Sequence, residues 1–196
     1  TTVHAYTSDQ PLADAVRSDL RRSRSAVENI IPNETWAPDY VAQLMPKFEQ
    51  KITGIAMNVP VANGSCIDLT TEMAIMPTIE EVNMSFQKAS RENLTGLVRY
   101  TEDPIVSSDA IGGGETMLFD SKATMIASEK LLKTVAWFDN GWGFASRILE
   151  LAESYSQLER LKMRVAINGF GRIGRSVFRI SVSYTHLTLP TSLIVE

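Results

Sequence analysis

The chain has 196 residues, 44% hydrophobic content and a formal net charge of −4, which is the composition of a globular protein of one or two domains. No apolar run approaches the roughly 18 residues of a transmembrane helix, and the first residues lack the basic and apolar regions of a signal peptide. We therefore expect a cytoplasmic protein with no membrane partner. One cysteine, Cys66, and two distant histidines, His4 and His186, argue against disulfides and metal binding. The mild acidity argues against a general nucleic-acid surface.

The first part of the chain carries strand and helix signals around a long loop. β-Branched and aromatic residues predict a strand over residues 1–6, and residues 7–33 form an irregular segment of a length that is usually functional or interfacial. A short helix is expected over residues 36–45. Alternating apolar residues predict two strands with one buried face over residues 52–60 and 67–75. Their apolar positions are Ile55, Met57, Val59, Ile67, Leu69, Met73 and Ile75.

The second part continues the same pattern. Thr78 followed by Glu81 forms a capping box that starts a helix through about Arg91, with Val82 and Phe86 on its core face. Short strands are expected over residues 96–101, 115–120 and 134–138. A long helix follows over residues 140–162, and its expected core face is Ala145, Ile148, Leu149, Ala152 and Tyr155. Together these elements predict an α+β domain with a mostly antiparallel or mixed sheet and helices on one face.

A glycine motif follows that domain. Gly169, Gly171 and Gly174 have the G-x-G-x-x-G spacing, after an apolar segment at 163–168 and before a helical pattern at 172–180. Such glycines permit a tight turn and bring backbone N–H groups close to a pyrophosphate, which the helix N-terminus stabilises. An ordinary strand-to-helix turn is the alternative, because the spacing alone is weak evidence.

Several stretches, taken in order, resemble the catalytic domain of the phosphorylating glyceraldehyde-3-phosphate dehydrogenase family. They are TTVHAYTSDQ, DLRRSR, NVPVANGS, YTEDPIVSSD and WFDNGWGFASR. The segment MRVAINGFGRIGR resembles the opening of the NAD-binding domain of the same family, which in the family comes first. The resemblance therefore implies a catalytic domain over residues 1–162, truncated at its N-terminal side, and the opening strand, turn and helix of a Rossmann fold over residues 163–181.

The end of the chain fits neither domain. Residues 182–191, VSYTHLTLPT, resemble the in-frame translation of a transposon adapter used in sequencing libraries. The helical pattern also dissolves after Ile180 into a run of serine and threonine that Pro190 ends. We therefore expect residues 182–196 to be a non-native tail, and the domain order to reflect a gene junction, an assembly artefact or a true circular permutation.

The resemblance implies chemistry in which a cysteine thiolate attacks a sugar-phosphate aldehyde, NAD accepts a hydride and phosphate cleaves the resulting thioester. His4 falls on the family's proton-accepting histidine, although a lone histidine in a strand is more often packed than catalytic. The family's nucleophilic cysteine lies upstream of this histidine and outside the chain. Cys66 does not replace it, because its place in a strand favours a small buried thiol. We therefore expect the chain alone to be inactive.

Substrate and cofactor contacts are also implied by the resemblance. Thr7, Arg22 and Thr35 match residues that bind phosphate, and Arg24 is a further basic position of the same loop, which in the family also meets NAD and a neighbouring subunit. Guanidinium groups suit phosphate, and a solvated basic loop is the alternative. Asn140 matches the asparagine that orients the nicotinamide carboxamide, and a helix N-cap is its alternative role. The cofactor turn comprises Gly169, Phe170, Gly171, Arg172, Ile173 and Gly174. These matches imply NAD, with NADP open, an aldehyde and phosphate as small-molecule partners, and a homo-oligomer.

Some positions depart from the family pattern. Asn58 stands where the family has a phosphate-binding arginine, and the alternation places it opposite Ile55, Met57 and Val59, facing a site. Trp36 replaces a glycine, Gly141 a glutamate, and Phe138 and Phe144 replace tyrosines. These changes suggest a divergent paralogue, such as an erythrose-4-phosphate dehydrogenase-like enzyme, acting on another aldehyde. A non-catalytic oligomerisation or interaction module of the same fold is a further alternative.

Overall fold

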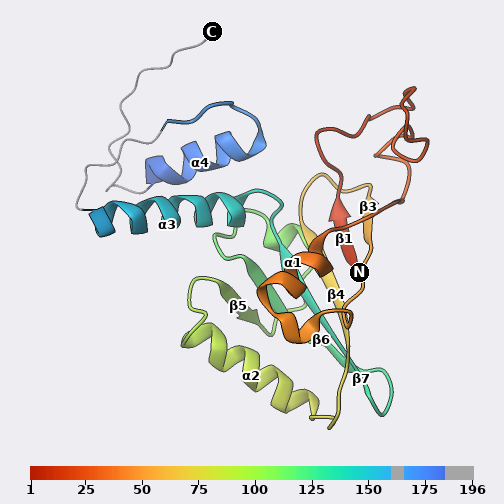
Figure 1. The fold of residues 1–196 in the computed structure, drawn as a ribbon, viewed down its shortest axis with the longest axis vertical. Helices are drawn as coiled ribbons and strands as arrows, with labels where there is room; N and C mark the ends of the chain where they lie inside the picture. The colour runs from red at the N-terminus through yellow and green to blue at the C-terminus, as the bar shows by residue number, and fades with distance from the viewer. Residues whose placement is uncertain (160–165, 184–196) are drawn as a thin grey trace.

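The computed structural model describes residues 1–159 and 166–183. The described residues form one seven-stranded sheet, four α-helices and two short 3-10 helices (Figure 1). In chain order the elements are β1 (Thr2–Ala5), β2 (Ile31–Asn33), α1 (Ala37–Leu44), η1 (Pro46–Phe48), β3 (Ala56–Val59), β4 (Ser65–Glu72), α2 (Ile79–Arg91), β5 (Val98–Thr101), η2 (Ser107–Ala110), β6 (Met117–Ile126), β7 (Leu131–Phe138), α3 (Trp142–Glu159) and α4 (Arg172–Ser183).

The sheet is mixed. Its strand order is β2-β3-β1-β4-β7-β6-β5, with β1 parallel to β3, β5 parallel to β6 and all other neighbours antiparallel. Helix α1 is drawn in front of the sheet in Figure 1, and α2 lies beside the β5–β6 end of the sheet, against which it packs. The predicted α+β class, with a mixed sheet and helices on one face, is therefore confirmed.

The main core lies between α2 and the β5–β6–β7 end of the sheet. Val82 of α2 packs with Val98, Phe119 and Leu132, and the ring of Phe86 stacks on that of Phe119 with centroids 3.8 Å apart. The predicted capping box is present, since Glu81 N donates to Thr78 Oγ1 (3.1 Å) and Thr78 N donates to Glu81 Oε2 (2.8 Å). The polar start and apolar face of this helix thus follow directly from its sequence.

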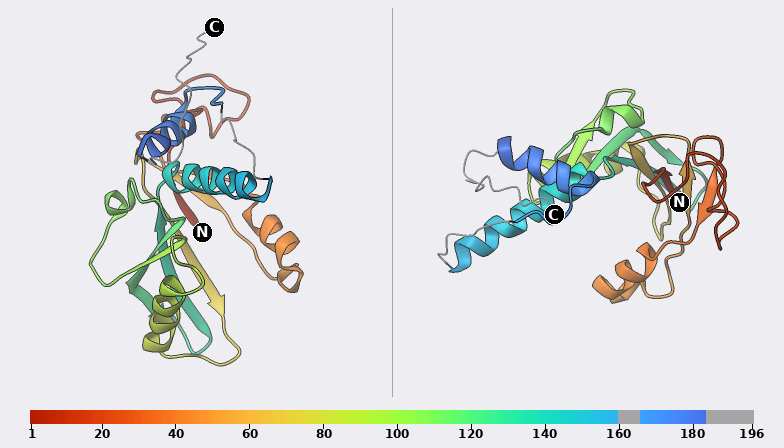
Figure 2. Two further views of the ribbon diagram at one scale, coloured as in Figure 1. Left: turned by 90° about the vertical axis from the view of Figure 1, so that its left-hand side faces the viewer. Right: turned by 90° about the horizontal axis from the view of Figure 1, so that it is seen from above.

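A second, smaller core joins α3 to α4. The two helices lie side by side in Figures 1 and 2, and Ala145 and Leu149 of α3 pack against Val177 and Ile180 of α4. The expected core face of α3 is correct at Ala145 and Leu149. At Ile148 and Tyr155 it is wrong, because these side chains are 38% and 56% exposed on the sides of α3 that α4 does not cover.

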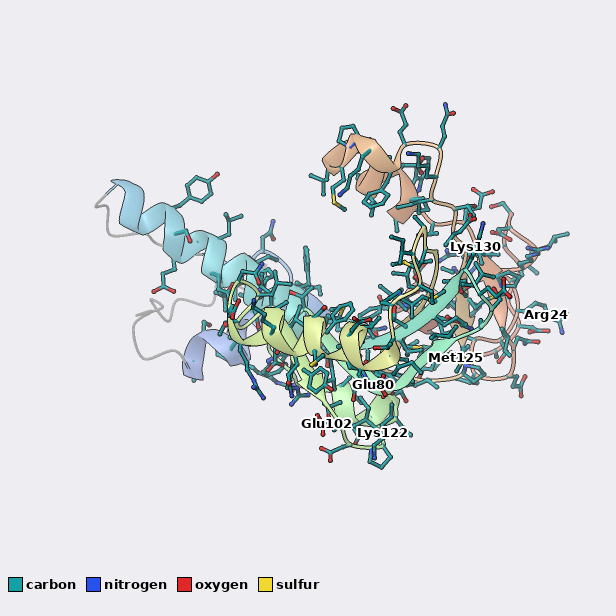
Figure 3. All side chains as sticks on the ribbon, turned by 90° about the horizontal axis from the view of Figure 1, so that it is seen from below. Arg24, Glu80, Glu102, Lys122, Met125 and Lys130 are labelled. Carbon is teal, nitrogen blue, oxygen red and sulfur yellow. The ribbon has the colours of Figure 1, made fainter. Side chains whose placement is uncertain are left out.

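The expected buried face of the strands is wrong near β1. Ile67 and Leu69 are 42% and 51% exposed, because α2 packs on the other end of the sheet and α1, which has no buried residue, stands away from it (Figure 3). The strand predicted over residues 52–60 begins only at Ala56. Strand β2 was not expected because it contains Pro32, which its position at the edge of the sheet permits.

The glycine motif forms its turn and helix without the expected strand. Residues 166–170 contain no strand, and residues 163–165 lie outside the described residues. Gly169 has a φ of +98°, and a Cβ at Gly174 would lie 2.1 Å from the Gly169 carbonyl oxygen, so both positions require glycine. Helix α4 continues through Val182 to Ser183, beyond the predicted end of the native sequence. In the described ranges, no helix is both long and apolar enough to span a bilayer.

Candidate functional site

A row of polar and aromatic side chains crosses four neighbouring strands at one end of the sheet. The register pairs His4 of β1 with Asn58 of β3, and Ser65 of β4 with Phe138 of β7. The His4 ring also stands edge-on to Phe138, with centroids 6.1 Å apart. Paired residues share a face of a sheet. The four side chains therefore lie on one face, which is the face that α2 covers farther along the sheet.

The peptide groups of Ala5 tie this row together. Ala5 is fully buried, its N–H donates to Ser65 Oγ (2.9 Å), and its carbonyl oxygen lies 2.5 Å from His4 Nδ1. Because a carbonyl oxygen can only accept, this contact places a hydrogen on Nδ1, and the neutral form of such a ring has its lone pair on Nε2. His4 is thus held in the tautomer that can accept a proton through Nε2.

Asn58 lies on the same face as His4, as its position in the strand predicts. It is 8% exposed, its Nδ2 donates to the Ala5 carbonyl oxygen (3.2 Å), and its Oδ1 accepts from Asn33 Nδ2. The amide therefore supports the carbonyl group that holds His4. The expectation that Ile55 marks a buried face is wrong, since Ile55 is 39% exposed and precedes β3.

Asn140 lies in the turn between β7 and α3. Its Oδ1 accepts from Ser65 Oγ (2.5 Å) and its N–H donates to Asn63 Oδ1 (3.1 Å). Its Nδ2 is buried and has no hydrogen-bond partner among residues 1–159 and 166–183. A buried amide donor without an acceptor is costly, so this group is suited to a ligand oxygen.

The alternative role of Asn140 as the helix cap is wrong, because Asp139 fills it. Asp139 Oδ1 accepts from the N–H groups of Gly141 and Trp142, both at 2.7 Å, and Oδ2 accepts from Gly112 N (3.0 Å) and Asn63 Nδ2 (2.9 Å). Partial burial acts to raise the pKa of Asp139, but these hydrogen bonds outweigh it and hold the pKa below its usual value of 3.8. The ionised carboxylate fixes the turn and leaves the Asn140 side chain free for another partner.

The glycine turn lies next to Asn140. A Cβ at Gly141 would lie 3.4 Å from Ile173 Cδ1 and 3.5 Å from Arg172 Cγ, and Arg172 Nη1 donates to the Ala62 carbonyl oxygen (3.3 Å). Within the described part of the chain, Cβ positions at Gly169 and Gly171 meet no atom within 4 Å, so no described residue covers this side of the turn. An open glycine turn at a helix start and an unpaired amide donor nearby fit a dinucleotide with a nicotinamide carboxamide.

The loop of residues 7–33 holds its charged side chains in ion pairs. Asp9 accepts from Thr7 Oγ1 and pairs with Arg22, which joins two of the predicted phosphate-binding residues. The Thr7 hydrogen bond and, against some desolvation, the Arg22 charge lower the pKa of Asp9. Arg24 Nε lies 3.2 Å from Asp14 Oδ2 at the outer edge of the molecule (Figure 3). Arg24 is therefore a surface residue.

A cavity of about 730 Å³ lies between this loop and the start of α1. Arg22 and Thr35 both line it, together with Asn33 and the exposed Trp36, so the structure brings two of the three predicted phosphate-binding residues to one cavity. Thr7 does not line it. Thr35 Oγ1 accepts from Ala37 N (3.3 Å). The remaining lining residues include both arginine and carboxylate side chains, and they are Asp19, Arg21, Pro32, Glu34, Asp39, Gly54 and Ile55.

Cys66 does not belong to this site. It pairs with Val3, and because side chains alternate along a strand, Cys66 and His4 lie on opposite faces of the sheet. Burial, followed by the nearby Asp68 charge, raises the pKa of the Cys66 thiol. A thiol that resists ionisation and faces away from His4 is not a nucleophile for this site.

Sequence reasoning missed three residues that organise the site: Ser65, Asp9 and Asp139. Of these, only Asp139 could have been recognised from the sequence, because an aspartate just before a helix is a favoured capping residue. Among residues 1–159 and 166–183, no group of three or more His, Cys, Asp or Glu side chains is placed to hold a metal ion.

Comparison with known proteins assigns the fold to a family. Residues 1–140 match the family described as glyceraldehyde 3-phosphate dehydrogenase, C-terminal domain. The chain is 46% identical over 151 residues to glyceraldehyde-3-phosphate dehydrogenase 2 of Streptomyces avermitilis, covering 77% of this chain and 45% of that protein. It is 41% identical over 152 residues to glyceraldehyde-3-phosphate dehydrogenase of Geobacillus stearothermophilus, covering 78% and 45%. The chain thus spans about half the length of these relatives, and it belongs to the glyceraldehyde-3-phosphate dehydrogenase family.

Proposed function

We propose that this chain carries the catalytic domain of an NAD-dependent phosphorylating aldehyde dehydrogenase. The observation that carries the proposal is the linkage of His4 to Asn140. His4 Nδ1 contacts the Ala5 carbonyl oxygen, and Ser65 joins its strand to an asparagine whose buried Nδ2 has no partner among the described residues. A proton acceptor and a carboxamide-binding group are thus held in one network, as hydride transfer from a bound aldehyde requires.

The proposed chemistry is the one that the family resemblance implies. A cysteine thiolate, supplied by the family motif upstream of His4, adds to the aldehyde carbon. His4 Nε2 then takes the hydroxyl proton while the C–H bond breaks, and a thioester forms. Bound NAD supplies the acceptor for that hydride. Phosphate then attacks the thioester carbon, the C–S bond breaks to release the thiolate, and the product leaves as an acyl phosphate.

The other predicted residues have binding roles in this proposal. Asn140 donates to the nicotinamide carboxamide oxygen, and the turn from Gly169 to Gly174 receives the pyrophosphate. Arg22 and Thr35 bind phosphate in their shared cavity, and Thr7 supports them through Asp9. NADP remains an alternative cofactor, because that choice depends on residues after the glycine turn.

The loop of residues 7–33 supports the proposed homo-oligomer. Its exposed apolar side chains include Leu12, Val16 and Leu20, at 61%, 105% and 80% exposure. Exposed apolar side chains gathered on one loop favour a protein interface. A cytoplasmic location is proposed with it, on the composition and the single cysteine.

The identity of the aldehyde is also a proposal. Asn58 is neutral and fully engaged by Asn33 and Ala5, so the position where the family has an arginine provides no positive charge. This supports a divergent paralogue that binds the phosphate of its aldehyde more weakly. A sugar-phosphate aldehyde remains the first candidate, because Arg22 and Thr35 are retained.

The domain division is a further proposal, with the catalytic domain over residues 1–162, the start of the cofactor domain over 163–181 and a non-native tail from 182. Sequencing the source DNA across codon 182 tests it. Uninterrupted native coding sequence through codon 196 would refute the tail, and a complete cofactor domain downstream of codon 181 would support a circular permutation.

The activity is tested by comparing this chain with the complete enzyme, in which the domain is joined to a whole cofactor-binding domain. We expect the complete enzyme to reduce NAD with glyceraldehyde 3-phosphate or another sugar-phosphate aldehyde, and to require phosphate for turnover. We expect no turnover from this chain alone, since Cys66 faces away from His4. Turnover by the chain alone would overturn the assignment of an external nucleophile and favour a different mechanism.

A further inference from the structure

Ser65 lies between His4 and Asn140 and takes no part in the bond-making steps proposed above. It begins β4, is 1% exposed, and its Oγ makes two hydrogen bonds. The hydroxyl accepts from Ala5 N (2.9 Å) and donates to Asn140 Oδ1 (2.5 Å). The Ser65 side chain therefore contacts both Ala5, the neighbour of His4, and Asn140, the neighbour of Asp139.

The two bonds of Ser65 determine how the Asn140 amide is oriented. A serine hydroxyl has a single proton, and Ala5 N–H already occupies one acceptor position of the oxygen. The proton of this buried hydroxyl must therefore be donated, and Asn140 Oδ1 is its acceptor. With the oxygen held in this way, Asn140 Nδ2 points to the other side, where it is buried and no described residue accepts from it.

The backbone of Asn140 is fixed by other groups. Asn63 Oδ1 accepts from Asn140 N (3.1 Å), and Asp139 holds Gly141 and Trp142. These contacts position the turn but leave the amide free to rotate about its terminal bond. Ser65 is the contact that selects one of the two orientations.

We propose that Ser65 is a positioning residue that orients Asn140 Nδ2 toward a carbonyl oxygen of the ligand and couples this orientation to the strand of His4. The inference rests on the proposed function, in which the carbonyl oxygen belongs to the nicotinamide carboxamide. A carboxamide held by one fixed donor presents one face of its ring. Ser65 thus controls both the affinity for the nicotinamide end of the cofactor and the face that receives the hydride.

The test uses the complete enzyme with two substitutions at this position, Ser65→Ala and Ser65→Cys. Cysteine approximates the shape of serine but is a weak donor, so a packing role tolerates it and a positioning role does not. Ser121→Ala and Ser121→Cys are matched controls, because Ser121 is also buried and its Oγ donates to the Thr101 carbonyl oxygen (2.6 Å), at the β5–β6 end of the sheet.

We expect both Ser65 variants to weaken NADH binding by about fivefold to tenfold, the effect of losing one ordered hydrogen bond. ADP-ribose, which lacks nicotinamide, should bind with unchanged affinity. Reduction with a deuterated aldehyde should give both stereoisomers of deuterated NADH in the Ser65 variants and a single stereoisomer in the wild type. The Ser121 variants should match the wild type in all three measurements.

Unchanged NADH affinity and stereochemistry in Ser65→Cys would overturn the positioning role. Equal losses of NADH and ADP-ribose affinity would also overturn it and assign Ser65 a structural role. If the wild type binds ADP-ribose and NADH equally well, with no contribution from nicotinamide, the assignment of Asn140 is itself wrong. If it binds neither, the proposed function fails and the positioning role fails with it.

Discussion

Two regions of the molecule hold their polar groups in opposite ways. Around Ala5 and Asn140, buried amides and hydroxyls bond to one another and to backbone, and the ionised Asp139 accepts four donors. In the loop of residues 7–33, Asp9 and Asp14 pair with Arg22 and Arg24 at the surface. Buried networks are rigid and fail when one member is lost, whereas exposed pairs contribute little and weaken in salt. The network around Ala5 and Asn140 is therefore preorganised, whereas the loop of residues 7–33, which carries Arg22, is adjustable.

The largest loss of stability is expected from Asp139→Ala. It removes the acceptor of Gly112, Gly141 and Trp142 N–H groups and should lower the free energy of unfolding by about 2 to 3 kcal/mol at neutral pH. Urea unfolding of the chain measures this value. Asp139→Asn, which keeps one acceptor oxygen, is the matched control and should lose less.

The pH dependence of this variant gives a second test. The folded pKa of Asp139 is lowered, so its stabilisation is present above the usual value of 3.8 and is lost as pH falls through the lowered folded pKa. The difference between wild type and Asp139→Ala should therefore shrink in acid. A difference that stays constant from neutral to strongly acidic pH would show that the carboxylate charge is unimportant.

A smaller loss is expected from Asn58→Ala. This change removes the bond to the Ala5 carbonyl and the acceptor Asn58 Oδ1, so that Asn33 Nδ2 keeps only the Ile31 carbonyl oxygen (3.2 Å), and it should cost about 1 to 2 kcal/mol in the free energy of unfolding. In the complete enzyme it should also lower kcat, because the Ala5 carbonyl orients His4. Asn33→Ala keeps the bond to Ala5 and is the control. Equal kcat losses in the two variants would contradict a specific link from Asn58 to His4.

The smallest effect is expected from Asp9→Asn in the loop. Loss of its partly exposed pair with Arg22 should change the free energy of unfolding by only about 0.2 to 1 kcal/mol, and the difference should decrease in high salt. In the complete enzyme the freed Arg22 should bind phosphate more tightly, which a lower KM for phosphate would report. An unchanged KM would show that Asp9 does not compete with phosphate for Arg22.

The sequence predicted where helices and strands occur better than it predicted the burial and the long-range contacts of their side chains. The capping box predicted the start of α2, and the alternation predicted that Asn58 points away from Met57 and Val59, on the face that the structure shows it shares with His4. The exposure of Ile67 was not predictable, since it depends on where α1 and α2 pack. Ser65 was missed because its two partners, Ala5 and Asn140, are 60 and 75 positions away and meet it only through strand pairing. At the start of α3, Asp139 and Asn140 are both good capping residues, so only the hydrogen bonds could assign the cap.

The central claim is that His4 accepts the proton of the reacting group through Nε2. The most direct measurement is the pH dependence of kcat/KM for the complete enzyme and its His4→Gln variant, with unfolding used to confirm that both are folded. We predict that the variant loses about 100-fold to 10,000-fold in activity and that the limb of the profile due to imidazole disappears. A folded variant with near wild-type activity and an unchanged pH profile would contradict the assignment of His4 as the base.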